Sequence, residues 1–335
     1  MFDHETIDIK AVTTFLLNNA ILMLLLLIFV VVGILRPGFF SLQVLINLIN
    51  NTAPRFIVAL GVSGCLIAKG TDLSAGRAVG LAGCIAATFL QRMDYAGKVY
   101  PGVGDINILL VIVGVVLIAA FFGAINGSVI SFLKVPPFIA TLGMQTIIYG
   151  ICLVFTGAQP IGGLREDYTR ISSGFLLDIK VLPFLGFFAL GCGVIIWFIY
   201  NKTAHGKYLF AIGGNEAAAE VNGINTSRTK IIIYASAGAL YGLAGFLLGA
   251  KAGGTSVNLG QGWELEAIAG CTIGGVSTNG GVGRVSGILI GVLVFELLKI
   301  AMQFMGVEPS YTYIVQGFVI VAAVAFDMRK HMGRK

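Results

Sequence analysis

The run from Ile106 to Leu133, INILLVIVGVVLIAAFFGAINGSVISFL, contains no charged side chain. A helix needs about 20 consecutive apolar residues to cross the hydrocarbon core of a bilayer. Lipid offers no hydrogen-bond partners to the backbone, so a run this long and this uniformly apolar favours a membrane helix over a barrel strand. This stretch therefore predicts an all-α integral membrane protein.

The same pattern recurs along the chain. Hydrophobic residues make up 57% of the 335 residues and charged residues 11%, whereas a soluble domain carries about 25% charge. We predict about ten spans in one transmembrane domain over residues 1–335, seven of them plain and three weaker. The plain spans are 18–35, 107–126, 138–156, 183–200, 231–250, 285–304 and 312–328, and the weaker ones are 45–68, 78–91 and 266–282.

The distribution of charge predicts the orientation of these spans. Cytoplasmic segments of membrane proteins collect Lys and Arg. With a cytoplasmic N-terminus, ten spans place 13 of the 22 basic residues and seven of the 16 acidic residues on the inner side. The resulting excess of +6 equals the formal net charge of the whole chain. Both termini are therefore expected in the cytoplasm, and the basic balance gives no support for nucleic-acid binding.

One polar segment, residues 201–230, separates two predicted spans. Within it, Asn215 suits a helix N-cap, the alanines and glutamates that follow favour a helix, and Gly223 suits its C-terminal end. These signals predict a short, separate helix of about two turns. We interpret it as a docking element for a partner on the cytoplasmic side.

Two polar breaks interrupt the apolar pattern, one in each half of the chain (45–156 and 231–328). Asp72-Leu73-Ser74-Ala75 in the first corresponds to Glu264-Leu265-Glu266-Ala267 in the second. Broken helices mark substrate paths in transporters, and opposite orientations of the two copies would make an inverted repeat. Thr71 or Asp72 is expected to cap the following helix. The alternative is an ordinary tight turn at the cytoplasmic surface.

Few other charges lie in apolar segments. Glu296 and Lys299 are three residues apart in one span and are predicted to pair. Arg55, after Pro54, is predicted to extend to the outer interface. No catalytic arrangement, metal-ligand spacing or phosphate-binding G-x-x-x-x-G-K-[ST] loop occurs, so we predict neither an enzyme nor an ATPase. Five acidic residues are expected in separate, solvated external turns: Asp94, Asp105, Glu166, Asp167 and Asp178.

The segment Thr203–Asn215, TAHGKYLFAIGGN, continues into Glu216-Ala217-Ala218 and resembles the ATPase-coupling loop of the ribose, xylose and galactoside branch of sugar ABC permeases. GTDLSAG at 70–76 and ELEAIA at 264–269 resemble two further signatures of that family, and the resemblance covers essentially the whole chain. Residues 54–80, 91–94 and 98–99 are most similar to its galactose and methyl galactoside members. The family pattern E-A-A-x-x-x-G is shifted here, because Gly223 falls one residue late.

This resemblance implies a permease subunit of an ATP-driven sugar importer in a bacterial inner membrane. It implies a homodimer with a central sugar path, a periplasmic sugar-binding protein, and a cytoplasmic ABC ATPase that uses ATP and Mg²⁺, the permease binding no cofactor itself. The residues implied at the ATPase contact are Gly206, Gly213, Gly214, Asn215, Glu216, Ala217, Ala218 and Gly223. Those expected near the path are Asp72, Leu73, Ser74, Gly76, Glu264 and Glu266.

Two alternatives remain at this stage. An ion-coupled secondary sugar transporter would not need the helical element within residues 201–230. A membrane enzyme acting on a lipid-linked sugar would need acidic residues or metal ligands gathered at an interface.

Overall fold

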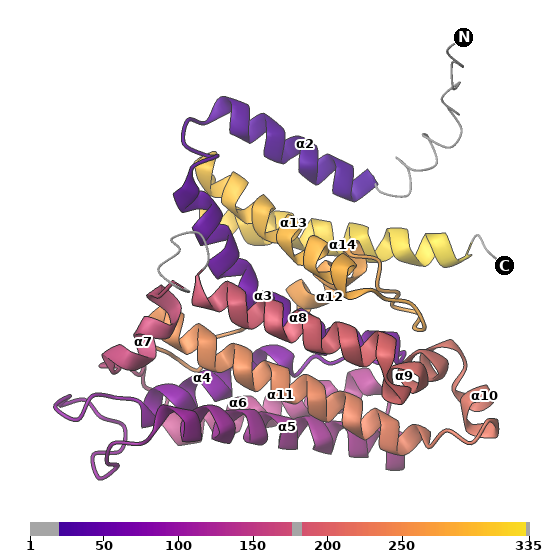
Figure 1. Ribbon diagram of the computed structural model, residues 1–335, viewed down its shortest axis with the longest axis horizontal. Helices are drawn as coiled ribbons and strands as arrows, with labels where there is room; N and C mark the ends of the chain where they lie inside the picture. The colour runs from indigo at the N-terminus through magenta and orange to yellow at the C-terminus, as the bar shows by residue number, and fades with distance from the viewer. Residues whose placement is uncertain (1–19, 176–182, 333–335) are drawn as a thin grey trace.

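The computed structural model describes residues 20–175 and 183–332, and within these ranges the chain is almost entirely helical (Figure 1). Three isolated β-bridges are the only extended pairings among the described residues. The described helices are α2 (Ala20–Leu35), α3 (Leu42–Ile67), α4 (Ala75–Phe89), α5 (Ile108–Phe132), α6 (Pro137–Thr156), α7 (Glu166–Ser173), α8 (Phe184–Lys202), α9 (Ala204–Gly214), α10 (Glu216–Val221), α11 (Thr226–Ala252), α12 (Trp263–Ile273), α13 (Val285–Phe304) and α14 (Pro309–Met332).

The described helices confirm an all-α architecture suited to a membrane. Six of them are long and apolar enough to cross a bilayer, namely α3, α5, α6, α8, α11 and α13. Helix α4 and the first part of α14, Pro309–Ala325, are shorter apolar helices. The start of the predicted span 18–35 lies outside the described residues, and its described part is α2.

The predicted span 266–282 is wrong, because α12 ends at Ile273 after only 11 residues. The chain then turns through Gly275, Gly280 and Gly281, whose φ angles are +84°, +85° and +73°. These left-handed conformations are readily adopted only by glycine and cannot continue a right-handed helix. Helix α12 is therefore a half-length helix followed by an irregular loop.

Helix α9, within the polar segment, is an element that the sequence pattern did not predict. Glycine disfavours helix formation, yet two glycines of α9 allow this helix to pack closely against its neighbours. A Cβ atom at Gly206 would meet the backbone of Ile199 and Tyr200, and one at Gly213 would meet the carbonyl oxygen of Ile67. The loop is thereby anchored to α8 and to the end of α3.

The long helices α3 and α11 run antiparallel at the centre of the molecule. Gly61 lies against Tyr241, and Gly64, almost one turn later, lies against Ile233. Each is followed by a non-helical link and a short helix. Helix α4 packs on α11 and α12 packs on α3, so each short helix lies against the long helix of the other half. An inverted repeat predicts such a reciprocal arrangement, in which the short helix of each half packs on the long helix of the other half.

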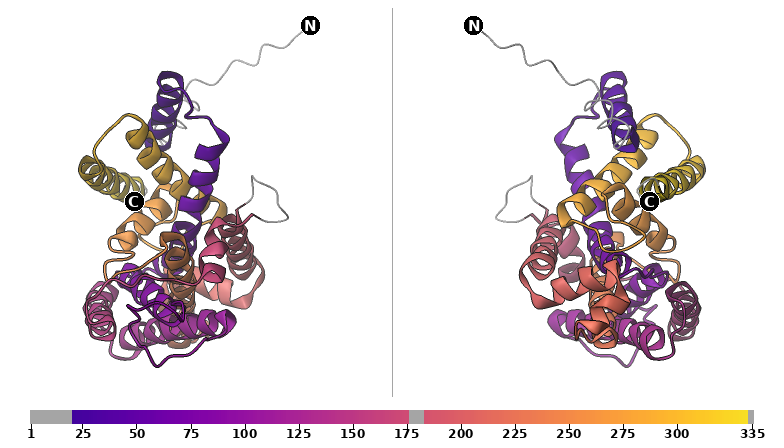
Figure 2. Two further views of the ribbon diagram at one scale, coloured as in Figure 1. Left: turned by 90° about the vertical axis from the view of Figure 1, so that its left-hand side faces the viewer. Right: turned by 90° about the vertical axis from the view of Figure 1, so that its right-hand side faces the viewer.

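The remaining helices surround this centre. Figure 2 shows α2, α13 and α14 toward one end of the molecule and α5 and α6 toward the other. Along the helix axes, α7 and α10 lie at opposite ends (Figure 1). Small residues allow the close contacts: a Cβ at Gly238 of α11 would collide with the Ala119 carbonyl of α5.

Candidate functional site

The link between α3 and α4 buries a polar cluster around Asp72, whose side chain is fully inaccessible to solvent. Asp72 Oδ1 accepts hydrogen bonds from the Ser74 backbone N–H at 3.0 Å and from its hydroxyl at 2.6 Å. Asn126 of α5 donates to the Ser74 hydroxyl at 3.0 Å. Helix α4 consequently begins after Ser74, so the prediction that Thr71 or Asp72 caps it is wrong.

Neighbouring helices hold this link in place. The Leu73 N–H donates to the Thr141 hydroxyl of α6 at 3.1 Å, and Tyr234 of α11 donates to the Thr71 carbonyl at 3.3 Å. The second carboxylate oxygen of Asp72 faces the hydroxyl of Tyr241. Neither of these two groups has a hydrogen-bond partner among the described residues. Buried polar atoms are normally satisfied, and because these two groups face each other, a small shift would let the Tyr241 hydroxyl donate to the Asp72 carboxylate.

The two sequence breaks meet at the first turns of α4 and α12. A Cβ atom at Gly76 would collide with the carbonyl oxygen of Gly260 and with the carboxylate of Glu264. Only glycine therefore permits this approach. The structure brings the segment from Asp72 to Gly76 and the buried Glu264 into one region, although they come from opposite halves of the chain.

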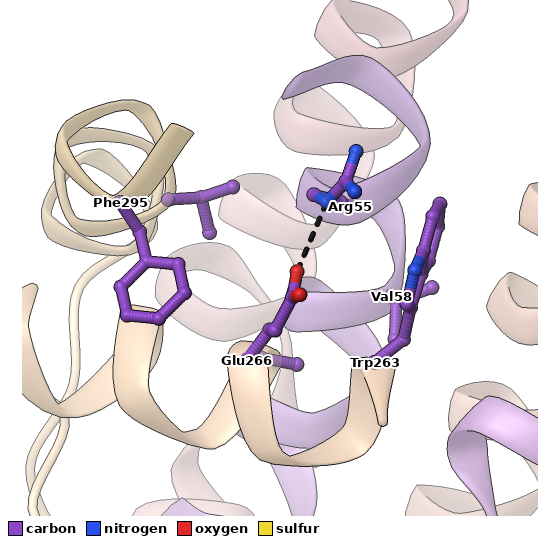
Figure 3. A pocket seen from close by; sticks show the side chains of 7 residues that line it. Arg55, Val58, Trp263, Glu266 and Phe295 are labelled. Atoms are coloured by element: carbon purple, nitrogen blue, oxygen red, sulfur yellow. Dashed lines mark hydrogen bonds and ion pairs between the residues drawn. The ribbon is translucent and has the colours of Figure 1, made fainter. Parts of the chain in front are cut away.

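Glu266 does not join that region but belongs to an ionic network with α3 and α13, of which Figure 3 shows the contact with Arg55 of α3. Its carboxylate accepts from Arg55 Nε at 3.0 Å and from Lys299 Nζ at 2.6 Å. Glu296 lies 3.4 Å from Arg55 and 3.6 Å from Lys299. The adjoining cavity, of about 10 Å³, has room for about one water molecule.

The prediction that Arg55 extends to the outer interface is wrong. Its guanidinium lies in the network and stacks on the Trp263 ring, 4.5 Å from the centroid. The carboxylates of α12 and α13 together neutralise Arg55 and Lys299 there, and a paired charge in the interior costs much less than an isolated one.

The predicted short helix in the polar segment is present as α10. Asn215 Oδ1 accepts from the Ala218 N–H at 3.0 Å and caps the helix as expected. At the other end Gly223 has φ +83° and donates its N–H to the Glu220 carbonyl at 2.9 Å. The helix has six residues, in agreement with the predicted length of about two turns.

Two of the residues implied at the ATPase contact, Gly206 and Gly213, are buried by packing and cannot present a surface. Glu216 is half-buried, and the remaining five are exposed: Gly214, Asn215, Ala217, Ala218 and Gly223. The sequence interpretation missed Val221, which is 88% exposed beside them. A single large apolar residue between Glu220 and Asn222 was the signal that could have found it. These residues form an exposed face with an apolar tip.

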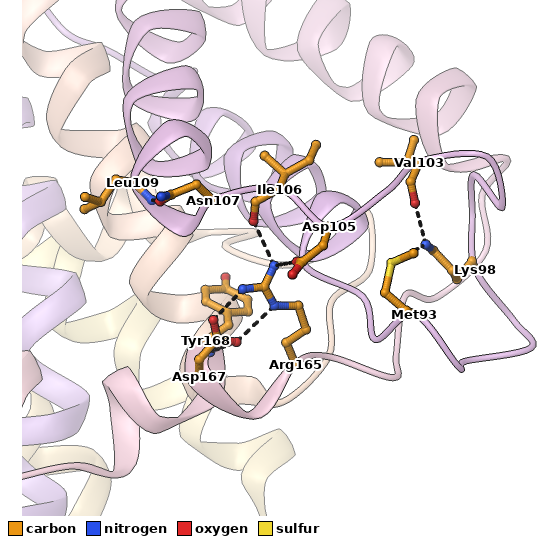
Figure 4. Close-up of polar contacts among 10 residues, drawn as sticks. All are labelled: Met93, Lys98, Val103, Asp105, Ile106, Asn107, Leu109, Arg165, Asp167 and Tyr168. Carbon is orange, nitrogen blue, oxygen red and sulfur yellow. Dashed lines mark hydrogen bonds and ion pairs between the residues drawn. The ribbon is translucent and has the colours of Figure 1, made fainter.

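At the opposite end of the molecule, Arg165 joins two segments (Figure 4). It forms ion pairs with Asp105 and Asp167 and donates to the Ile106 carbonyl at 2.8 Å. The prediction that the external acids lie in separate turns is therefore wrong for these two, while Asp178 lies outside the described residues. Arg165 fastens the 91–107 loop to the start of α7.

Arg165→Ala is expected to increase protease cleavage of the 91–107 loop several-fold. The hydrogen bond from Arg165 lowers the pKa of the Asp167 carboxyl. This pair therefore stabilises the fold above the ordinary pKa of Asp167 and loses its effect as the pH falls through the lowered pKa. Limited proteolysis against pH measures both effects. Arg170→Ala is the control, since its exposed pair with Glu166 lies within α7, and equal cleavage of the two variants would contradict the prediction.

Comparison with known proteins places the chain among permeases. Residues 44–324 match the family described as branched-chain amino acid transport system / permease component. The chain is 42% identical to the galactose/methyl galactoside import permease protein MglC of Escherichia coli over 330 residues, 97% of this chain and 98% of that protein. The MglC protein of Haemophilus influenzae is 42% identical over 303 residues, covering 89% and 90% of the two chains.

A ribose permease is also similar. The ribose import permease protein RbsC of Bacillus subtilis is 36% identical over 303 residues, 90% of this chain and 89% of that protein. No solved structure matches the chain. The relatives are named as import permeases, which are transport subunits and not enzymes.

Proposed function

This chain belongs to the permease family described as the branched-chain amino acid transport system permease component, and we propose that it imports galactose and methyl galactosides. The relatives named for these sugars are 42% identical to it over nearly the whole chain, against 36% for the ribose permease of Bacillus subtilis. A neutral sugar needs hydroxyl and amide partners in a path that is wet only transiently. The cluster of Asp72, Ser74 and Asn126, close to the junction of Gly76 with Glu264, supplies such groups.

Membership of this permease family favours a separate cytoplasmic ABC ATPase, using ATP and Mg²⁺, as the source of energy for import; the chain itself has no phosphate-binding loop. The observation that carries this proposal is the exposed face of α10, with Val221 88% exposed at its tip. Helices α9 and α10 are not among the described helices that are long enough to span a membrane, and we place Val221 outside the lipid. An apolar side chain on such a face suits a protein partner.

The complete transporter would contain two copies of this chain with the sugar path between them, in a bacterial inner membrane. Both termini and α10 then lie in the cytoplasm, and α7 lies on the periplasmic side, where a sugar-binding protein docks. Residues 1–335 form one transmembrane domain with repeat halves 45–156 and 231–328.

Purification from native membranes tests the assignment. We expect an ABC ATPase to travel with the chain, and galactose uptake to stop on ATP depletion but to survive collapse of the ion gradients. Recovery without an ATPase, together with uptake that follows the ion gradient, would establish a secondary transporter instead.

Gly223→Pro is expected to lower sugar uptake by about tenfold while the partner ATPase remains active, a loss of coupling of ordinary size. Proline fixes φ near −65° and has no N–H, whereas Gly223 has φ +83° and donates to Glu220. The end of α10 should therefore unfold locally.

Gly157→Pro is the matched control for this variant. Gly157 also has a positive φ, +59°, and also donates its N–H at a helix end, but it lies at the end of α6 near the outer loops. Uptake and ATP hydrolysis are measured together in proteoliposomes with the partner ATPase. Equal loss of uptake in both variants would show a general folding effect and would contradict a specific role for the α10 end.

A further inference from the structure

Two side-chain contacts fasten α10 to the first turns of α11. Lys230 Nζ lies 2.6 and 2.7 Å from the two carboxylate oxygens of Glu216. The Thr226 hydroxyl donates to Glu220 Oε1 at 2.6 Å. The first contact holds the start of α10 and the second holds its last turn, so both ends of the short helix are attached to one long helix.

The same face of α10, together with Lys230 and Tyr234 of α11, borders a cavity of about 510 Å³. Glu216, Ala217 and Glu220 line it from α10, facing the Lys69-Gly70 link and the turn at Pro136-Pro137. The packing contacts of α10 are with α9 and α11. Displacement of α10 can therefore alter this cavity. Helix α10 cannot, however, separate from α11 without breaking the two polar contacts.

Helix α11 continues from these contacts to the buried Asp72 cluster. Tyr234 donates to the carbonyl of Thr71, and the hydroxyl of Tyr241 faces Asp72. Both tyrosines are buried. Gly238 and Gly242 of α11 pack against the α5 backbone, and Gly245 packs against that of α4. Closely packed helices transmit displacement with little deformation.

We infer that Glu216 and Lys230 form a transmission clamp, which delivers the movement of α10 through α11 to the Asp72 cluster. Both are positioning residues, since neither contacts that cluster, and the Thr226–Glu220 bond supports the clamp. This inference rests on the proposed function, in which a cytoplasmic ATPase displaces α10. It adds the route by which that displacement reaches the broken helix.

A charge-swap series in the complete transporter tests the clamp. Glu216→Lys, Lys230→Glu and the double variant are reconstituted with the partner ATPase, and the sugar transported per ATP hydrolysed is measured. Each single variant is expected to lower this ratio by about tenfold. The double variant restores the ion pair with reversed polarity and should return the ratio to within about threefold of the original chain.

Arg228→Glu is the control for charge reversal at this face. Arg228 is exposed in the same turn of α11, and no ion pair of its side chain occurs among the described residues, so the ratio should stay unchanged. Thr226→Val, nearly isosteric, removes only the second contact and should lower the ratio less than Lys230→Glu does.

Absence of rescue in the double variant would overturn the clamp and would mean that Glu216 acts by touching the ATPase directly. A normal ratio in Lys230→Glu would overturn it as well. Failure of the proposed function looks different: the original chain itself would transport without ATP, and no coupling ratio would exist to compare.

Discussion

Gly76→Val is expected to reduce sugar uptake by about 100-fold or more, because overpacking at a backbone contact cannot be relieved by a side-chain movement alone. A Cβ atom at Gly76 would collide with the Gly260 carbonyl oxygen. The Gly260 backbone is itself closely packed, since a Cβ atom there would meet the Gly76 carbonyl oxygen and the Val79 side chain. The first turn of α12 would move away from α4, and the two breaks would no longer meet beside Asp72.

Gly114→Val in α5 provides the matched control for this substitution. It is also a helical glycine, but nothing lies within 4 Å of the position its Cβ would take. Uptake is compared at equal amounts of each variant in the membrane, with recovery of the partner ATPase as the check on folding. Wild-type uptake by a correctly assembled Gly76→Val variant would show that the contact between the breaks is not needed for transport.

The long apolar helices could be predicted from the sequence because lipid requires a continuous apolar surface. The predicted span 285–304 coincides with α13, and the predicted start at 107 is one residue from that of α5. The capping signals at Asn215 and Gly223 were equally informative, since they depend only on local hydrogen bonds and φ angles. The fold class and the exposed short helix α10 therefore follow from local chemistry.

The side-chain contacts around the two breaks, and the length of α12, could not be predicted in the same way. Arg55 finds Glu266 at a distance of 211 residues along the chain, and no local pattern indicates that pairing. The length of α12 depends on which glycines adopt positive φ, and neither hydropathy nor helix propensity distinguishes them. The sequence indicated that the residues of the two breaks lie near one another, but it did not indicate which of them are in contact.

Arg55→Met is expected to lower the free energy of unfolding by about 3–5 kcal/mol, the usual cost of removing one partner from a buried ionic network. The carboxylates of Glu266 and Glu296, only 16% and 4% exposed, would then have Lys299 as their one ion-pair partner among the described residues. Thermal unfolding of the purified protein in detergent measures the loss. Arg170→Met is the control, because its exposed pair with Glu166 contributes less than about 1 kcal/mol.

The double variant Arg55→Met with Glu296→Gln separates the two ways in which Arg55 stabilises the fold. Removing one acid restores the balance, since Lys299 still neutralises Glu266 at 2.6 Å. If charge balance dominates, the double variant should unfold at a higher temperature than Arg55→Met alone. If stacking on Trp263 dominates instead, the double variant should gain nothing over the single one. An Arg55→Met protein as stable as Arg170→Met would contradict both accounts, because an unbalanced buried carboxylate would then carry no cost.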